Sequence, residues 1–192
     1  LDAIVIRSIP APTPQHERCG ISTKTLEEHI DFINANKIEK ISINSESIDF
    51  ITKCPSLKYF SITPTDNSDN NFDYSPLYEM PQVKSLGCST RYGKREELST
   101  SIDCSRLKGL ESLFVNGNGF KNFEQIHTLK SLKFFYYDIY DLSDAFCSTI
   151  LDTLSITKGK FKSLNGIEKS EKLQCLYLYY NHSLQDISAL AK

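Results

Sequence analysis

The chain has 192 residues, of which 40% are hydrophobic and 11% aromatic, and this is enough for one domain with a substantial core. Its 22 basic and 24 acidic residues give a formal charge of −2, which excludes a global field that would hold nucleic acid or a membrane surface. No apolar run approaches the roughly 20 residues that cross a bilayer, so we expect no membrane insertion.

Cysteine usage and the first residues bear on the compartment. The six cysteines are scattered with no C-x-x-C pair, at positions 19, 54, 88, 104, 147 and 175. This spacing favours free, mostly buried thiols in a reducing compartment over a disulfide framework or a metal site. The opening LDAIVIRSIPAPTP has no long apolar segment and no small-residue cleavage site, so we expect a cytoplasmic protein. Because the chain starts at Leu1 and not at Met, secretion or surface display after signal removal is the alternative.

Residues 1–36 are expected to form a strand, a proline-rich turn and a helix that closes the N-terminal end of the fold. The strand is predicted at 3–7 by the first copy of an L-x-x-L-x-L pattern. The segment TLEEHIDFINAN predicts a helix of about ten residues, in which Thr25 and Glu28 form a capping box. Its apolar stripe is Leu26, Ile30 and Ile33.

Residues 37–192 repeat the same pattern, with Ile, Val, Phe, Tyr or Cys at some apolar positions. Seven further copies start at 38, 57, 83, 110, 132, 151 and 173 and predict parallel strands at 40–44, 59–63, 85–89, 112–116, 134–138, 153–157 and 175–179. Between strands, apolar residues recur at every third position, which is the period of a 3-10 helix. Neither piece can bury its apolar face alone, so the units must stack around a shared core. The last residues, 190–192, keep the repeat rhythm without a polar cap, so we expect the array to continue past 192.

The repeats resemble the leucine-rich repeat family. Its hallmark L-x-x-L-x-L-x-x-N-x-L is met from Leu110 to Phe120, with Asn118 in the turn, and from Leu173 to Leu184, with Asn181 and one extra residue. Other copies carry Glu46, Tyr140 and Gly159 in place of the asparagine, so the asparagine ladder of the family is expected to be incomplete.

Three segments narrow the resemblance to the bacterial internalin-like class of 22-residue repeats: LQDISALAK, FDYSPLYEMPQ and SLNGIEKSEKL. The resemblance implies an α/β, right-handed solenoid. A curved parallel β-sheet lines its concave face, and turns and 3-10 segments form its convex face.

The positions between the inward leucines face solvent on the concave sheet and are the candidate site. The early copies place mainly Ser, Thr and Gly there, whereas the later copies place aromatic residues. Clustered exposed aromatics favour a contact surface, and the alternative is that they only stack on one another across strands. The predicted binding residues on this face are Tyr59, Phe114, Phe134, Tyr136, Asp138, Tyr177, Tyr179 and Tyr180.

Two long segments after strands, 63–71 and 89–101, are expected to project from one rim of the coil. The second carries Arg91 and Arg95, which we include among the predicted partner contacts because charged tips can orient a partner. The alternative is that both segments are simply solvated loops.

No constellation of catalytic groups is evident. The histidines at 16, 29, 127 and 182 lie in separate parts of the repeat array, and the NGNG segment at 116–119 lacks the Lys-Ser/Thr of a phosphate loop. We therefore expect a non-catalytic module, without cofactor or metal, that binds a partner protein; its oligomeric state is not predicted. The alternatives are the substrate-recognition part of a larger enzyme or ligase, an immunity-type protein that occludes a toxin, and a structural or self-associating spacer.

Overall fold

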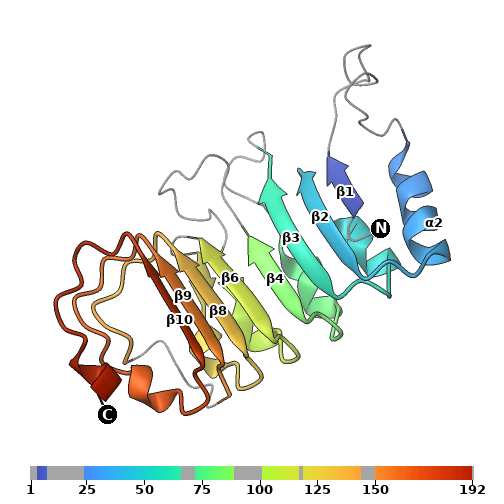
Figure 1. The fold of residues 1–192 in the computed structure, drawn as a ribbon. Helices are drawn as coiled ribbons and strands as arrows, with labels where there is room; N and C mark the ends of the chain where they lie inside the picture. Colours follow the sequence, from blue (N-terminus) through green and yellow to red (C-terminus); the bar gives the residue numbers. More distant parts are fainter. Residues whose placement is uncertain are drawn as a thin grey trace.

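A computed structural model describes residues 4–7, 24–65, 72–88, 101–116, 119–143 and 150–191, with the backbone alone for 4–7. Among these residues, eight parallel strands form one sheet, and they lie side by side in chain order (Figure 1). The strands are β1 (Ile4–Arg7), β2 (Lys40–Ser45), β3 (Tyr59–Pro64), β4 (Ser85–Cys88), β6 (Ser112–Asn116), β8 (Ser131–Phe135), β9 (Thr153–Thr157) and β10 (Cys175–Tyr179). The predicted parallel sheet is confirmed.

Seven of the eight predicted strands agree with the structure to within two residues, and the sixth is wrong. It was predicted at 134–138, but β8 starts three residues earlier, at Ser131. The true pattern in this repeat is Leu129, Leu132 and Phe134, and both leucines and the phenylalanine are buried. Because the shift is an odd number of residues, Phe134 and Phe135, which the predicted and the observed strand share, face the opposite sides of the sheet from those predicted.

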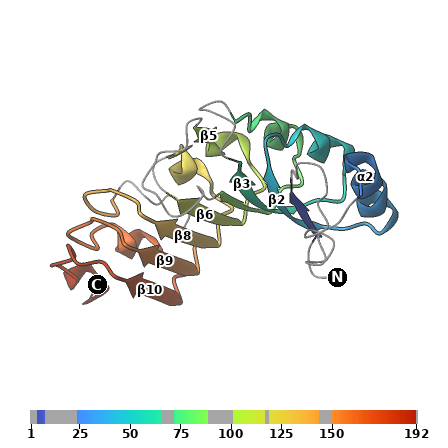
Figure 2. The same ribbon diagram turned by 90° about the horizontal axis from the view of Figure 1, so that it is seen from above.

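The convex side of the coil consists of short 3-10 helices and one small extra ladder. The 3-10 helices are η1 (Asp49–Lys53), η2 (Ser75–Glu79), η4 (Cys104–Arg106), η5 (Phe123–Gln125), η6 (Ile167–Lys169) and η7 (Ser188–Ala191), and the ladder pairs β5 (Ile102–Asp103) with β7 (Phe120–Lys121). Viewed from above, these elements lie on one side of the sheet. The sheet bends so that its other, free face is concave (Figure 2). The structure thus has the predicted concave and convex layers.

Short polar side chains start most of these convex segments. The backbone amide of Ser75 donates to Asp73 Oδ1 (2.7 Å), that of Ser143 to Asp141 (2.9 Å) and that of Ser188 to Asp186 (2.9 Å). Such Asx turns supply acceptors for amides that the 3-10 turn itself leaves unpaired. The D-x-S segments noted in the sequence therefore have a structural role at the convex turns.

The N-terminal helix α2 (Leu26–Ala35) has the predicted capping box: the Glu28 amide donates to Thr25 Oγ1 (3.2 Å), and the Thr25 amide donates to Glu28 Oε2 (2.7 Å). Ile30 and Ile33 are buried as predicted, but Leu26 is 43% exposed, so it does not belong to the buried stripe. The helix lies next to η1, where the Asn34 side chain donates to the Lys53 carbonyl (3.0 Å). It takes the place of a 3-10 segment at this end of the convex layer.

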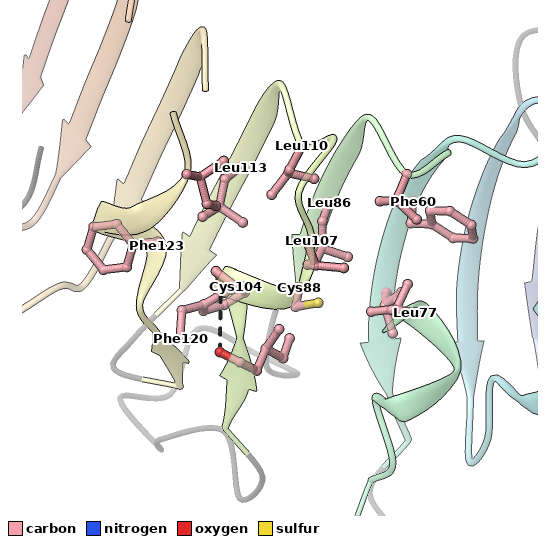
Figure 3. Close-up of a cluster of buried hydrophobic side chains, with 14 of the residues drawn as sticks. Phe60, Leu77, Leu86, Cys88, Cys104, Leu107, Leu110, Leu113, Phe120 and Phe123 are labelled. Atoms are coloured by element: carbon pink, nitrogen blue, oxygen red, sulfur yellow. Dashed lines mark hydrogen bonds between the residues drawn. The ribbon is translucent and has the colours of Figure 1, made fainter. Parts of the chain in front are cut away.

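The core runs continuously between the sheet and the convex segments. Leu113, Leu132 and Leu154 occupy the same position in successive repeats, and each is 0% exposed. Figure 3 shows part of this core, in which Cys88 and Cys104 pack among leucines and phenylalanines as free thiols. Burial raises the pKa of the Cys104 thiol to about 12 and that of Cys88 well above its ordinary value, so both are neutral and act as small apolar side chains.

The last repeat is packed differently from those before it. Leu176 and Leu178 of β10 are only half-buried, whereas their counterparts Leu154 and Ile156 in β9 are at most 1% exposed. In the convex segment of the same repeat, Ile187 is 56% exposed and Leu190 is 53% exposed. The core is therefore open to solvent at the β10 end of the described sheet.

Candidate functional site

The free face of the sheet presents three rows of side chains that run across the strands in register. We call them the concave rows. The first is Lys40, Tyr59, Ser85, Ser112, Ser131, Thr153 and Cys175; the second is Ser42, Ser61, Gly87, Phe114, Lys133, Ser155 and Tyr177; the third is Asn44 and Thr63, then Asn116, Phe135, Thr157 and Tyr179. Neighbouring members are about 4.8 Å apart, the spacing of adjacent strands.

In the middle of the face, Phe114 lies beside Gly87 on the neighbouring strand. A Cβ added at Gly87 would lie 3.5 Å from Phe114 Cβ and 3.6 Å from Phe114 Cδ1. The phenylalanine is half-buried as a result. Of the aromatics predicted as contacts, Phe114 therefore has part of its surface already covered within the chain.

Two tyrosines of β10 stand parallel and exposed on the concave face. Tyr177 is 44% exposed and Tyr179 is 49% exposed, and their ring centroids are 6.3 Å apart with an interplanar angle of 7°. A hydrogen bond with the Cys175 side chain raises the pKa of Tyr177, so this phenol is neutral at ordinary pH. The pair offers a large apolar surface with polar tips, the chemistry that is enriched at protein interfaces.

Immediately after β8, β9 and β10, three residues 22 positions apart share a left-handed backbone: Tyr136 (φ 56°), Lys158 (φ 56°) and Tyr180 (φ 55°). We call them the end-of-strand row. Inter-repeat hydrogen bonds hold this conformation, since the Tyr136 amide donates to the Thr157 carbonyl (3.1 Å) and the Lys158 amide to the Tyr179 carbonyl (2.8 Å). A non-glycine residue in this region is strained, so the shared conformation indicates a constraint on where these side chains point.

The Lys158 ammonium group is held by aromatic partners. Its Nζ donates to the Tyr136 hydroxyl (2.7 Å) and lies 4.8 Å from the centroid of the Tyr136 ring and 5.7 Å from that of Phe135. The two rings contact each other edge to face, with centroids 4.5 Å apart. These contacts position the charge but leave it uncompensated, because a phenol and an aromatic ring carry no net negative charge.

The residue just before each of β2, β3, β4, β6, β8 and β9 is charged, and these residues form a row along the opposite edge of the sheet. We call it the charge row: Glu39, Lys58, Lys84, Glu111, Lys130 and Asp152. Lys58 pairs with Glu39, and Glu111 is bound by both Lys84 and Lys130 at 2.8 Å. The hydrogen bonds from Lys130 and then Lys84 lower the pKa of Glu111 to about 2. Opposite charges on neighbouring repeats thus neutralise this edge.

The fold of this chain is similar to solved structures of known proteins. No protein-family model matches the chain, and no curated protein matches it. Internalin C2 (InlC2) from Listeria monocytogenes superposes with a TM-score of 0.52 and 15% identity, over 76% of this chain and 66% of the internalin structure. The chain has the leucine-rich repeat fold. It spans just under two thirds of the InlC2 structure and 56% of InlF from the same organism, which matches over 80% of this chain with 16% identity and a TM-score of 0.44.

One turn of the leucine-rich repeat array contains the asparagine that the sequence pattern predicted. The Asn181 side chain accepts from the Gly159 amide (2.8 Å) and donates to the Ile156 carbonyl (2.9 Å), so it connects two repeats. Gly159 occupies the equivalent turn one repeat earlier. With the corrected register, Tyr137, rather than Tyr140, occupies it two repeats earlier and packs on Phe134 and Phe123. The asparagine ladder is thus interrupted by an aromatic side chain.

The predicted contact residues have different positions within the leucine-rich repeats. Tyr59 (39% exposed), Phe114, Tyr177 and Tyr179 lie in the concave rows, and Tyr180 (68% exposed) follows them in the end-of-strand row. Phe134 was placed wrongly: it is 1% exposed and belongs to the core. Tyr136 follows β8 instead of lying within a strand, and exposed Asp138 pairs with Lys160 (2.8 Å). Arg91 and Arg95 lie outside the described residues.

Sequence reasoning missed three residues of this surface and the charge row. Because of the register error in β8, Phe135 was assigned to the inward face and Lys133 was omitted from the strand. Lys158 is recognisable only from its backbone conformation and its contacts. Five members of the charge row could have been found, because they occupy the second position of L-x-x-L-x-L; Lys130 occupies it only in the corrected register. Among the described residues, no His/Cys/Asp/Glu cluster could hold a metal ion, and no helix is both long and apolar enough to cross a membrane.

Proposed function

We propose that the chain is a non-catalytic interaction module that binds a partner protein on the concave face of β6 to β10. The observation that carries this proposal is the parallel, exposed pair Tyr177 and Tyr179 on β10. Exposed aromatic pairs are uncommon on surfaces without a contact role, and tyrosine is enriched among residues that dominate binding energy.

The surroundings of this pair support a binding surface. The rings project from a strand whose backbone is hydrogen-bonded to β9 along its whole length, so little conformational entropy is lost when a partner binds. Serine and threonine hydroxyls at Ser131, Thr153, Ser155 and Thr157 surround the aromatics and offer donors and acceptors. The alternatives of a larger enzyme's recognition part or an immunity-type protein would use the same surface.

The test compares Tyr177→Ala/Tyr179→Ala with the matched control Ser42→Ala/Ser61→Ala on β2 and β3. Both pairs lie in the concave rows and point away from the core, so the tyrosine variant should lose no more than about 1–2 kcal/mol of unfolding free energy. Its affinity for the partner should fall by about 2 kcal/mol or more if one ring is a hot spot. The serine variant should retain both properties.

The partner is captured from cells that express the protein, identified, purified and titrated against all three proteins by calorimetry. Chemical denaturation of the same samples gives stability. A tyrosine variant that is less stable yet binds with unchanged affinity would show that the rings only stack on one another.

We also propose a reducing compartment, in keeping with a cytoplasmic location. Cys88 and Cys104 lie near each other in the core and are free thiols (Figure 3). All six cysteines of the native protein should react with a thiol reagent in denaturant without prior reduction. A native disulfide would overturn this assignment.

A further inference from the structure

The charges on the concave face are of one sign. Among the concave rows, the charged side chains are Lys40 and Lys133, and no Asp or Glu occupies any outward position of the described strands β2 to β10 of the large sheet. By contrast, the charge row at the edge of the same sheet has three lysines and three carboxylates and is neutralised by ion pairs between repeats. The outward positions of these described strands therefore carry positive charge without an acidic residue among them.

Two of the positive groups flank the tyrosine pair. Lys133 is exposed on β8 and forms no ion pair with a residue that the structure describes. Lys158, in the end-of-strand row, has the uncharged Tyr136 hydroxyl as its hydrogen-bond partner, and the carboxylate at this edge, Asp138, is occupied by Lys160. An ammonium group has three donors, so Lys158 retains donors for an acceptor outside the chain.

The end-of-strand row presents Lys158 between two tyrosines. Tyr136 and Tyr180 hold the equivalent positions in the repeats on either side, about 4.8 Å away across the sheet. All three residues adopt the left-handed backbone, which is strained for a residue with a side chain. Strain of this kind is often retained where it aims functional side chains.

We propose that the partner segment recognised by this face is acidic: an extended polypeptide with one carboxylate on Lys133, a second on Lys158, and an apolar side chain against Tyr177 and Tyr179. This inference rests on the proposed function and specifies the charge and conformation of the partner segment. Lys133 and Lys158 are one strand and three residues apart, which is about 10 Å. Side chains of an extended chain alternate between its two faces, so the two acidic side chains that turn toward the lysines should be two or four positions apart, which spans about 7–13 Å.

A nucleic-acid partner has less support. The chain as a whole carries −2, and the charge row beside the face contains carboxylates that would repel a phosphate backbone. Two lysines can satisfy two carboxylates, whereas a polyanion needs a longer basic track. The experiment includes an oligonucleotide so that this outcome is visible.

The probe is a phage-displayed library of random 12-residue peptides, selected on the immobilised wild-type protein at low salt. Enriched sequences should contain two acidic residues two or four positions apart, with an aromatic or aliphatic residue near them. A synthetic peptide with the consensus is then titrated, and its affinity should fall as salt is raised.

The decisive variant is Lys133→Gln/Lys158→Gln, with Lys53→Gln/Lys121→Gln as the control that removes the same charge from two exposed positions of the convex side, in η1 and β7. The first variant should bind the peptide about tenfold more weakly or worse, and the control should bind like the wild type. Lys133→Arg/Lys158→Arg should restore most of the affinity because it restores the charge. Circular dichroism confirms that each variant is folded.

Each other outcome overturns the inference. Enriched peptides that are basic or uncharged, equal binding by the Lys133/Lys158 variant and the wild type, or tighter binding of single-stranded DNA would each show that the partner is not an acidic polypeptide. If Tyr177→Ala/Tyr179→Ala abolishes peptide binding while the lysine variant does not, the proposed function stands and only this inference fails. If no peptide is enriched, or no concave variant changes binding, both fail.

Discussion

The early and late repeats differ at one position of the same pattern, the residue seven places after its first leucine. In the early repeats this residue is Ser45 or Pro64, and it is the last residue of a six-residue strand. In the late repeats it is Tyr136, Lys158 or Tyr180; the strands end one residue earlier, and the backbone turns left-handed. Proline cannot adopt that conformation, because its ring fixes φ near −65°.

Repeat length accounts for part of this difference. From Leu129 onward the pattern recurs every 22 residues, whereas the earlier intervals from residue 38 are 19, 26, 27 and 19 residues. Equal repeats allow the same turn to recur, so side chains that leave it lie in line across the sheet. The later half therefore has an ordered row of aromatic and basic groups beside its concave rows, and the earlier half mainly has small hydroxyl groups.

The largest expected effect on stability distinguishes the buried core of β9 from the half-buried core of β10. Leu154→Ala, at a position that is 0% exposed, should lower the unfolding free energy by about 2–5 kcal/mol. Leu176→Ala, at the equivalent but half-buried position of β10, should cost about half as much, because part of that side chain is already in water. Urea denaturation of both variants measures the difference. Equal losses would mean that the last repeat is as well packed as those before it.

The next test concerns the left-handed turn. Lys158→Pro should cost about 3 kcal/mol or more, because proline cannot adopt φ 56° and lacks the amide that donates to the Tyr179 carbonyl. Lys158→Gly is the control, since glycine accepts this conformation and should change stability by about 1 kcal/mol at most. Thermal denaturation compares them. A proline variant as stable as the glycine variant would contradict the assigned backbone.

The smallest effect is expected from the charge row. Because the pKa of Glu111 is held at about 2, below its ordinary value near 4.5, the ionised side chain stabilises the folded state at neutral pH. This contribution is complete above pH 4.5 and disappears as the pH falls from there through about 2. Glu111→Gln should flatten the stability–pH curve in this window, whereas Glu46→Gln, at an exposed site outside the row, should not. Identical stability–pH curves for the wild type and Glu111→Gln would contradict a stabilising role of the ionised Glu111 side chain.

The sequence was sufficient to predict the parallel sheet, the 3-10 segments and the capped helix, because each depends on a periodic apolar pattern or a local capping box. It was not sufficient for β8. The three-residue step of the 3-10 segment continues into the first step of L-x-x-L-x-L, so Phe123, Ile126, Leu129 and Leu132 give no signal of where the strand begins. The same slip exchanged Phe134 for Phe135 on the concave face.

The candidate site was predicted less well than the fold for a related reason. The exposure of Tyr177 and Tyr179 follows from strand alternation, which the sequence contains. The position of Lys158 against Tyr136 depends on the left-handed backbone of both residues. They are 22 positions apart, so no local pattern of residue types specifies this contact. The predicted continuation of the array past 192 and the division at residue 36 stay predictions.

The open packing of β10 has a consequence for dynamics. In a solenoid each unit is stabilised mainly by its neighbours, and β10 is paired with β9 alone among the described strands. In a chain of these 192 residues, its amides should therefore exchange with solvent deuterium faster than those of β6 or β8. Because Tyr177 and Tyr179 belong to the same strand, a bound partner would slow that exchange, and the extent of the slowing in β10 would measure how tightly the partner binds.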